Sequence, residues 1–247
     1  MRQALLGLAA LAGAACGNNF HPEQYPSPEA LLAASNAAYE RGDCGAAVQG
    51  FTRALFELQP RDPRVAEVRY LLGECHLKNG DRLQASQELR RVADEFPGHE
   101  LAPRALLRAA DALAAMWKRV ELDPTYGEQA AATYAEVASR FPNAEAAVQA
   151  RERAAALADR FALKELKNGD LYYRVHAYDS AIIYYRSVVA TYPDSKHVPA
   201  ALLKLVETYR RIGYAEEAGE TCEHLRRFFP TADGVARTCP APAPAAG

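Results

Sequence analysis

Two of the five cysteines stand beside histidines, a pairing that could bind zinc. Cys75 directly precedes His76, and Cys222 lies two residues before His224. A structural zinc site needs four thiolate or imidazole ligands, and neither pair has two further ligands at zinc-like spacing. The sequence also lacks a G-x-S-x-G motif, a phosphate-binding glycine loop and an H-E-x-x-H motif. We therefore expect no cofactor, no metal and no catalytic residues, and we expect His76 to pack inside the fold.

Another cysteine, Cys16, follows an apolar segment near the N-terminus. Arg2 supplies a positive charge, residues 4–15 are uncharged and apolar, and the segment ends in "GAAC". This run is too short to span a bilayer but suits a secretory signal peptide. Its end resembles the bacterial lipoprotein box, in which cleavage leaves an acylated cysteine, although Gly13 stands where that box usually has Leu. We predict a signal peptide over residues 1–15 and lipid attachment at Cys16. Ordinary secretory cleavage beside a chance cysteine is the alternative.

The composition is that of a globular protein without affinity for nucleic acid. The 247 residues are 49% hydrophobic and 24% charged, and 29 Lys+Arg against 31 Asp+Glu give a net charge of −2. A chain with this net charge lacks the broad positive electrostatic potential that binding to the phosphate backbone of nucleic acid requires. Residues 16–27 and 233–247 are rich in proline and in polar or small residues. We expect a tether and a flexible tail on either side of a folded region at residues 28–232.

The folded region repeats one pattern five times. A small residue is followed four residues later by a larger one, three later by an apolar one, and then by a proline. The five sets are Ala47, Phe51, Ala54 and Pro60; Ala85, Leu89, Val92 and Pro97; Ala130, Tyr134, Val137 and Pro142; Ala181, Tyr185, Val188 and Pro193; and Ala218, Cys222, Leu225 and Pro230. Spacings of four and three residues place these side chains on one face of a helix, which the proline ends.

A second periodic stretch precedes each copy, so the repeating unit is a helix-turn-helix. In "YLLGECHLKNGDRLQA", Leu72, Gly73, His76, Gly80 and Ala85 occupy positions 7, 8, 11, 15 and 20 of a 34-residue unit. This is the tetratricopeptide pattern, and five copies exceed the roughly three that are needed to bury a continuous core. We predict an all-α fold, a superhelical solenoid of five tetratricopeptide repeats.

Repeats three and four carry insertions. The stretch "AAMWKRVELDPTYGEQ" lengthens the turn within repeat three, and Asp123-Pro124 begins the second helix of that repeat. Residues 143–170 read as one long helix that runs into repeat four. Asn168-Gly169 could instead form a turn, but the repeat register assigns Gly169 to the small position 8. We therefore predict a continuous helix there.

Taken together, the five repeats, the signal segment and Cys16 resemble the outer-membrane barrel-assembly lipoproteins of the BamD (YfiO/ComL) family. The likeness covers nearly all of residues 16–232. It is most specific in "LDPTYGEQAAATYAEVASRFPNAE", where that family has the same insertion and the same closing aromatic-Pro-Asn.

The resemblance implies a non-enzymatic periplasmic scaffold that a lipid holds on the outer membrane. It further implies that the C-terminal repeats bind POTRA domains of the barrel-inserting protein and that the N-terminal repeats bind nascent outer-membrane proteins. Repeat scaffolds serve many partners, so another function stays open. The alternative is a different envelope tetratricopeptide lipoprotein, such as a secretin pilot or a cell-wall or Tol-Pal coordination factor, and an enzyme of unrecognised type is more distant.

Four cysteines remain for the oxidising compartment that the signal segment implies. Cys44 opens the second helix of repeat one, and Cys75 lies near the end of the first helix of repeat two. Stacking of the repeats should make these two ends neighbours, so Cys44 and Cys75 are the candidates for a disulfide. The alternative is that both are small buried residues without a bridge.

The first helices of tetratricopeptide repeats line a concave face, into which positions 2, 5, 9, 12 and 13 point. In repeats one and two, the candidate groove residues at these positions are Asn36, Tyr39, Glu40, Tyr70, Glu74 and Lys78. Tyrosines among charged groups suit an extended peptide with aromatic side chains. The alternative is that Tyr39 and Tyr70 merely cover neighbouring helices.

Overall fold

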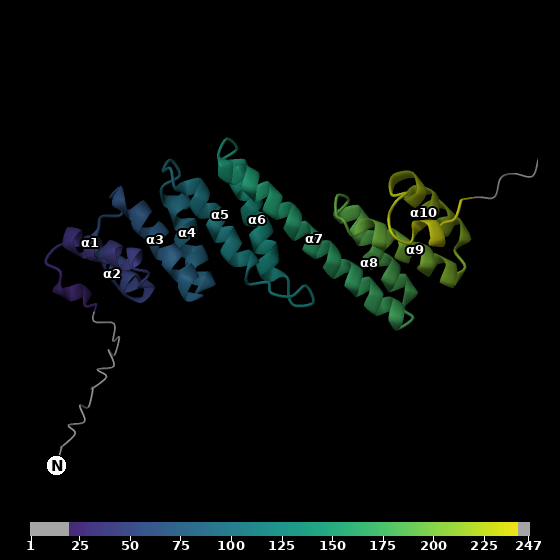
Figure 1. The fold of residues 1–247 in the computed structure, drawn as a ribbon, viewed down its shortest axis with the longest axis horizontal. Coiled ribbons are helices and arrows are strands. Elements are labelled where there is room, and N and C mark those ends of the chain that lie inside the picture. The colour runs from purple at the N-terminus through teal and green to yellow at the C-terminus, as the bar shows by residue number, and fades with distance from the viewer. Residues whose placement is uncertain (1–19, 242–247) are drawn as a thin grey trace, which may run out of the picture.

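The computed structural model describes residues 20–241, and its regular elements there are all helices. Ten long helices form five antiparallel pairs, which follow one another along an elongated array (Figure 1). The pairs are α1 (Pro28–Glu40) with α2 (Cys44–Glu57), α3 (Arg64–Asn79) with α4 (Arg82–Glu95), α5 (Ala102–Ala114) with α6 (Thr125–Arg140), α7 (Glu145–Arg174) with α8 (Tyr178–Thr191), and α9 (Val198–Ile212) with α10 (Ala215–Phe228). Short helices, η1 (Pro22–Gln24) and α11 (Val235–Thr238), flank them. The predicted all-α solenoid of five repeats is confirmed.

The core of each repeat forms where its two helices cross. Phe51, Leu89 and Tyr185 occupy the same place on their second helices and have no exposed surface. Opposite two of them the first helix has a glycine: a Cβ on Gly73 would lie 2.5 Å from Leu89 Cγ, and a Cβ on Gly169 would lie 2.6 Å from Tyr185 Cδ1. The glycines therefore make room for the large side chains of the second helices.

Helix α7 is continuous over its 30 residues, as the register of Gly169 predicts. Its first half, up to Phe161, belongs to the core that α5 and α6 form. From Ala162 onward it belongs to the core of α8 and α9. Figure 1 shows α7 running obliquely from the first group of helices to the last. One long helix thus joins the two parts of the array.

The insertion of repeat three, residues 115–124, packs along α7. Trp117 is 2% exposed and stacks on Phe161 with ring centroids 4.7 Å apart. Lys164 Nζ donates to the carbonyl oxygens of Val120, at 3.2 Å, and Leu122, at 3.0 Å. A buried indole and backbone hydrogen bonds therefore hold this loop in place.

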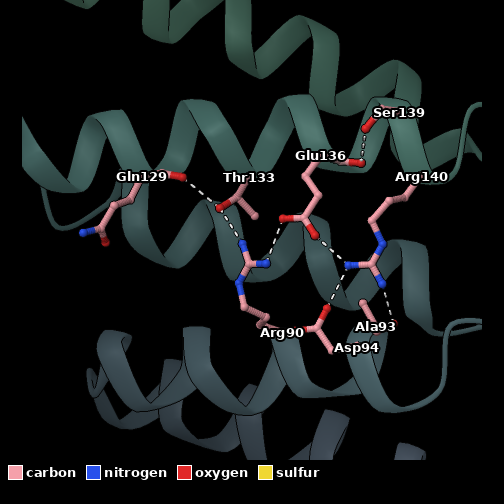
Figure 2. A network of polar contacts seen from close by, with 8 residues as sticks. All are labelled: Arg90, Ala93, Asp94, Gln129, Thr133, Glu136, Ser139 and Arg140. Carbon is pink, nitrogen blue, oxygen red and sulfur yellow. Dashed lines mark hydrogen bonds and ion pairs between the residues drawn. The ribbon is translucent and has the colours of Figure 1, made fainter.

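Ion pairs join the second helices of repeats two and three (Figure 2). Arg90 on α4 donates to Glu136 Oε2 at 2.7 Å and to Thr133 Oγ1 at 2.9 Å. Arg140 on α6 donates to Glu136 Oε1 at 2.6 Å and to Asp94 Oδ1 at 2.8 Å. Burial alone would raise the pKa of Glu136, but the hydrogen bonds from both arginines outweigh it and lower that pKa. Glu136 therefore stays ionised and links α4 to α6.

The structure contains two disulfides, one near each end of the array. Cys44 pairs with Cys75, whose Cα atoms are 5.0 Å apart, and this links α2 to α3. Cys222 pairs with Cys239, with Cα atoms 5.2 Å apart, and this ties α10 to the chain after α11. The first disulfide joins the two cysteines predicted as candidates, whereas the second pair was among the pairings open to the four cysteines and was not singled out.

The predicted tail and tether need correction. Residues 233–247 were expected to bury little, but Val235 is 2% exposed in the core of the last repeat, and Arg210 Nη1 donates to Thr238 O at 2.8 Å. At the other end, Phe20 and Tyr25 pack against the core of repeat one, so part of the 16–27 tether is docked. Apolar contacts formed by isolated residues have no periodicity that sequence analysis could detect. Cys16 and the predicted signal peptide lie outside the described residues.

Replacing Gly169 with alanine is expected to destabilise the fold by about 1–3 kcal/mol, because the added methyl group collides with the buried ring of Tyr185. Gly219→Ala is the matched control: Gly219 is also helical, but its added Cβ would meet nothing within 4 Å. That change should stabilise by about 0.5–1 kcal/mol, as expected for Gly to Ala in a helix. Urea unfolding followed by circular dichroism measures both. Equal stability of the two variants would contradict the packing described for Gly169.

Candidate functional site

The first helices present two hollows on one side of the solenoid. The smaller, of about 280 Å³, lies between α1 and α3 and is lined by residues that include Leu32 and Asn36. The larger, of about 530 Å³, is lined by residues of α3, α5 and the start of α7, among them Glu74, Arg104 and Arg108. We call these hollows and the first-helix residues around them the groove. It runs along the face where the sequence analysis placed a peptide-binding surface.

Residues predicted on repeat one lie in or beside the groove. Asn36 and Glu40 are exposed, and Tyr39 is half-buried. Lys78 from α3 holds its Nζ 4.4 Å from the centroid of the Tyr39 ring. A cation over the face of an aromatic ring is attracted by about 0.5–1 kcal/mol at exposed sites. The fold therefore brings Tyr39 and Lys78 together from consecutive repeats, and both remain accessible.

Tyr70 is more enclosed than a binding anchor should be. It is only 7% exposed and packs in the core of repeat two with Ala66, Ala85 and Leu89. Burial raises the pKa of the Tyr70 hydroxyl, and the nearby Glu74 carboxylate adds to the rise. Of the two interpretations weighed from the sequence, the structure favours for Tyr70 the one in which it covers neighbouring helices.

Glu74 is engaged in a two-point ion pair across the groove. Arg108 Nε donates to Glu74 Oε1 at 2.7 Å and Arg108 Nη2 donates to Oε2 at 2.9 Å. The two residues are 34 positions apart, the length of one repeat. They therefore occupy equivalent positions on α3 and α5. A guanidinium that holds both carboxylate oxygens fixes the spacing of these first helices.

Arg104 and Arg108 are groove residues that the sequence analysis did not identify. Both lie one repeat of 34 residues after Tyr70 and Glu74, so the register of repeat two, extended by one repeat, predicts them. Arg104 lies 5.7 Å from the centroid of the Tyr70 ring. Among residues 20–241 it forms no ion pair, so it offers an exposed guanidinium inside the larger hollow.

Arg153 of α7 lines this hollow and belongs to a hydrogen-bond network with Asp111 of α5 and Tyr134 of α6. Arg153 bonds to Asp111, and Tyr134 donates its hydroxyl hydrogen to the same carboxylate at 2.8 Å. Burial, followed by the charge of Asp111, raises the pKa of Tyr134. Arg108 Nη1 also lies 4.0 Å from Asp111 Oδ2, so this carboxylate is engaged by two arginines and a tyrosine, whereas Arg104 has no ion-pair partner within residues 20–241.

No metal-binding cluster is found among residues 20–241. They contain no group of three or more His, Cys, Asp or Glu side chains that could hold a metal ion. The His76 side chain is 16% exposed, with Nδ1 lying 3.6 Å from Asp81 Oδ2, while Cys75 is in a disulfide. Within residues 20–241, no helix combines the length and apolar character needed to cross a membrane.

Comparison with known proteins relates this chain to one family. The family model described as "Outer membrane lipoprotein" (YfiO) matches residues 24–225. The outer membrane protein assembly factor BamD of Caulobacter vibrioides is 29% identical over 204 residues, which are 82% of this chain and 67% of the relative. That of Vibrio cholerae is 27% identical over 236 residues, 92% and 96% of the two chains.

Solved structures with a similar backbone fold include tetratricopeptide-repeat proteins. The repeat domain of P58(IPK) matches with a TM-score of 0.46 at 16% identity, covering 85% of this chain and 54% of that one. The Thermus thermophilus protein TTC0263 matches with a TM-score of 0.38 at 20% identity, covering 86% and 97%. At these values we draw on neither for function.

The different burial of the two groove tyrosines has a measurable consequence. Tyr70→Ala should lower the free energy of unfolding by about 3 kcal/mol, since it removes a buried aromatic ring from the core. Tyr39→Ala should lower it by less than about 1 kcal/mol because the ring is half-exposed. Urea titration of both variants beside the unchanged protein tests this. If Tyr70→Ala proved as stable as Tyr39→Ala, Tyr70 would return to the list of binding residues.

Proposed function

Because this chain belongs to the outer membrane lipoprotein family YfiO, whose model matches residues 24–225, we propose that it is a non-enzymatic periplasmic scaffold of the outer-membrane barrel-assembly machinery. The observation that carries the proposal is the groove on the first helices of repeats one to three. It offers apolar surface, paired charges and, within the described residues, an unpaired guanidinium at Arg104. The BamD relatives are named as outer membrane protein assembly factors, which agrees with this role.

The groove is proposed to bind nascent outer-membrane proteins in extended form. Tyr39 and Leu71 provide apolar contact area, and Lys78 and Arg104 provide cations. A tyrosine gives contact area with few rotatable bonds, and an arginine can bind a carboxylate through two hydrogen bonds. The best match is a segment with aromatic side chains that ends in a free carboxylate. Barrel substrates, as the family resemblance implies, end in a strand of that kind.

The C-terminal repeats are proposed to bind the POTRA domains of the barrel-inserting protein. Here Lys204 Nζ lies 5.9 Å from the centroid of the Tyr173 ring, and Arg211 Nε donates to the Tyr178 hydroxyl at 3.2 Å. Tyrosine and arginine are enriched among residues that dominate binding energy at interfaces. This surface lies on α7 to α9, apart from the groove, so one molecule could hold both partners at once.

A lipid on Cys16 is proposed to place the first repeat close to the outer membrane. Phe20 is docked on the core of repeat one. Four residues of chain span at most about 14 Å at ~3.3–3.6 Å each. The membrane surface would therefore lie within that short reach of α1 and α2.

Removing the sulfur of Cys16 tests the anchor. Cys16→Ser should move most of the protein from the outer-membrane fraction to the soluble periplasmic fraction, because two or more acyl chains hold a protein firmly whereas one binds only at ~10⁴ M⁻¹. Cys222→Ser, which removes a different sulfur, should remain in the membrane fraction. Membrane retention of Cys16→Ser would mean that protein contacts, not lipid, provide the attachment.

Peptide binding tests the groove. A synthetic peptide with alternating aromatic residues and a free C-terminal carboxylate should bind the purified protein, and Tyr39→Ala or Arg104→Ala should each weaken binding by about 1–2 kcal/mol. The control is Arg151→Ala, an exposed arginine on α7 that does not line either hollow. Isothermal titration calorimetry gives the affinities.

The role of Arg104 can be isolated with the same peptide carrying an amide in place of its carboxylate. Amidation should weaken binding to the unchanged protein but not to Arg104→Ala, since the interaction is already lost there. Equal loss in both proteins would show that Arg104 does not bind the carboxylate.

A further inference from the structure

In the regular repeats, one face of each first helix packs against the second helix of the preceding repeat. On α3 this face consists of Val65, Val68, Leu72 and Cys75, all of which are buried in the core that α1 and α2 form. On α9 the equivalent residues are Val198, Ala201, Leu205 and Thr208, which are buried where α9 packs on α8. The spacing of three, four and three residues is the same in both helices. This face is therefore built to receive a helix.

On α7 the same positions are only partly covered. Gly169 corresponds to Gly73, since each packs beneath the large residue of its own second helix. Counting from these glycines, the positions of Val68, Leu72 and Cys75 fall on Lys164, Asn168 and Leu171. Leu171 is 50% exposed, and Val175, one turn further along, is 61% exposed. We call Lys164, Asn168, Leu171 and Val175 the open face.

The length of α7 explains why this face has no helical cover. The preceding second helix, α6, shares a core with Ala146, Ala150 and Leu157 in the first half of α7. The register of repeat four begins beyond that half, at Ala162, which belongs to the next core. The insertion of repeat three lies beside the first part of the face, where Lys164 donates to its backbone carbonyls and Lys167 pairs with Glu121.

A hollow of about 520 Å³ lies over the open face, and its charges are predominantly positive. Lys164, Lys167 and Arg174 line it, together with Glu121 and Asp170. Glu121 is already paired with Lys167, and Asp170 accepts a hydrogen bond from the Tyr185 hydroxyl at 2.9 Å. Lys164 is bonded only to carbonyls, and Arg174 forms no ion pair within residues 20–241. Two cations thus lack carboxylate partners beside two exposed aliphatic side chains.

We propose that the open face is a docking site for an amphipathic helix of a partner protein, one that carries aliphatic residues and carboxylates. The helix would take the place that α2 takes on α3 and α8 takes on α9. Its aliphatic side chains would cover Leu171 and Val175, and its carboxylates would pair with Arg174 and Lys164. This site is separate from the groove, and it does not depend on the function proposed for the groove.

Crosslinking from the open face identifies what covers it. A photoreactive amino acid replaces Leu171 in the full-length protein in its own membrane, and Ile183, 67% exposed on α8 and outside the face, is replaced in the control. Mass spectrometry of the crosslinked peptide is expected to give a helical segment with carboxylates beside aliphatic residues, obtained from position 171 and not from 183. Equal yields from both positions would overturn the proposal. So would a crosslink to a strand, to lipid or to a second copy of this chain.

Substitutions then test the chemistry with that segment as a synthetic peptide. Leu171→Asp and Arg174→Glu should each weaken its binding to the purified protein about tenfold or more, whereas Ile183→Asp should leave it unchanged. Both substituted residues are exposed, and urea unfolding checks that all three variants remain equally stable. Should Leu171→Asp unfold more easily than the control, the Arg174→Glu result decides. Unchanged binding by Arg174→Glu would contradict the acidic helix.

Discussion

The two helices of a repeat approach most closely where the first has a glycine and the second has a large side chain. In repeats two and four this is the contact of Gly73 with Leu89 and of Gly169 with Tyr185. Such a close crossing fixes both the distance and the angle between the helices. Stacking of consecutive helix pairs sets the first helices side by side with equivalent positions aligned. The ion pair between Glu74 and Arg108, one repeat apart, follows from that alignment. The groove is therefore a consequence of the core.

The two proposed binding surfaces are separated where the chain departs from this regularity. The two departures are the insertion after α5 and the extra length of α7. They contact each other, because Trp117 of the insertion stacks on Phe161 of α7 and Lys164 of α7 donates hydrogen bonds to backbone carbonyls of the insertion. Together they separate the groove of the first three repeats from the tyrosine and arginine surface of the last two. A scaffold that holds two partners needs such a separation.

Much of the fold could be predicted because it depends on local periodicity. The spacing around Phe51, Leu89 and Tyr185 was sufficient to predict five helix pairs, and the register of Gly169 was sufficient to predict a continuous α7. The docking of Phe20 and Val235 could not be predicted, since an isolated apolar residue in a proline-rich segment has no period. In the groove, the positions of Tyr39 and Lys78 followed from register. The burial of Tyr70 did not, because it depends on how α4 and α5 pack around its ring.

The central claim is that this chain is a scaffold of barrel assembly, and co-purification from the outer membrane tests it most directly. The tagged full-length protein is isolated from solubilised outer membrane, and its partners are quantified by mass spectrometry against a mock purification. The account predicts stoichiometric recovery of a barrel protein that carries POTRA domains. Recovery of a secretin or of Tol-Pal components in its place would contradict the account.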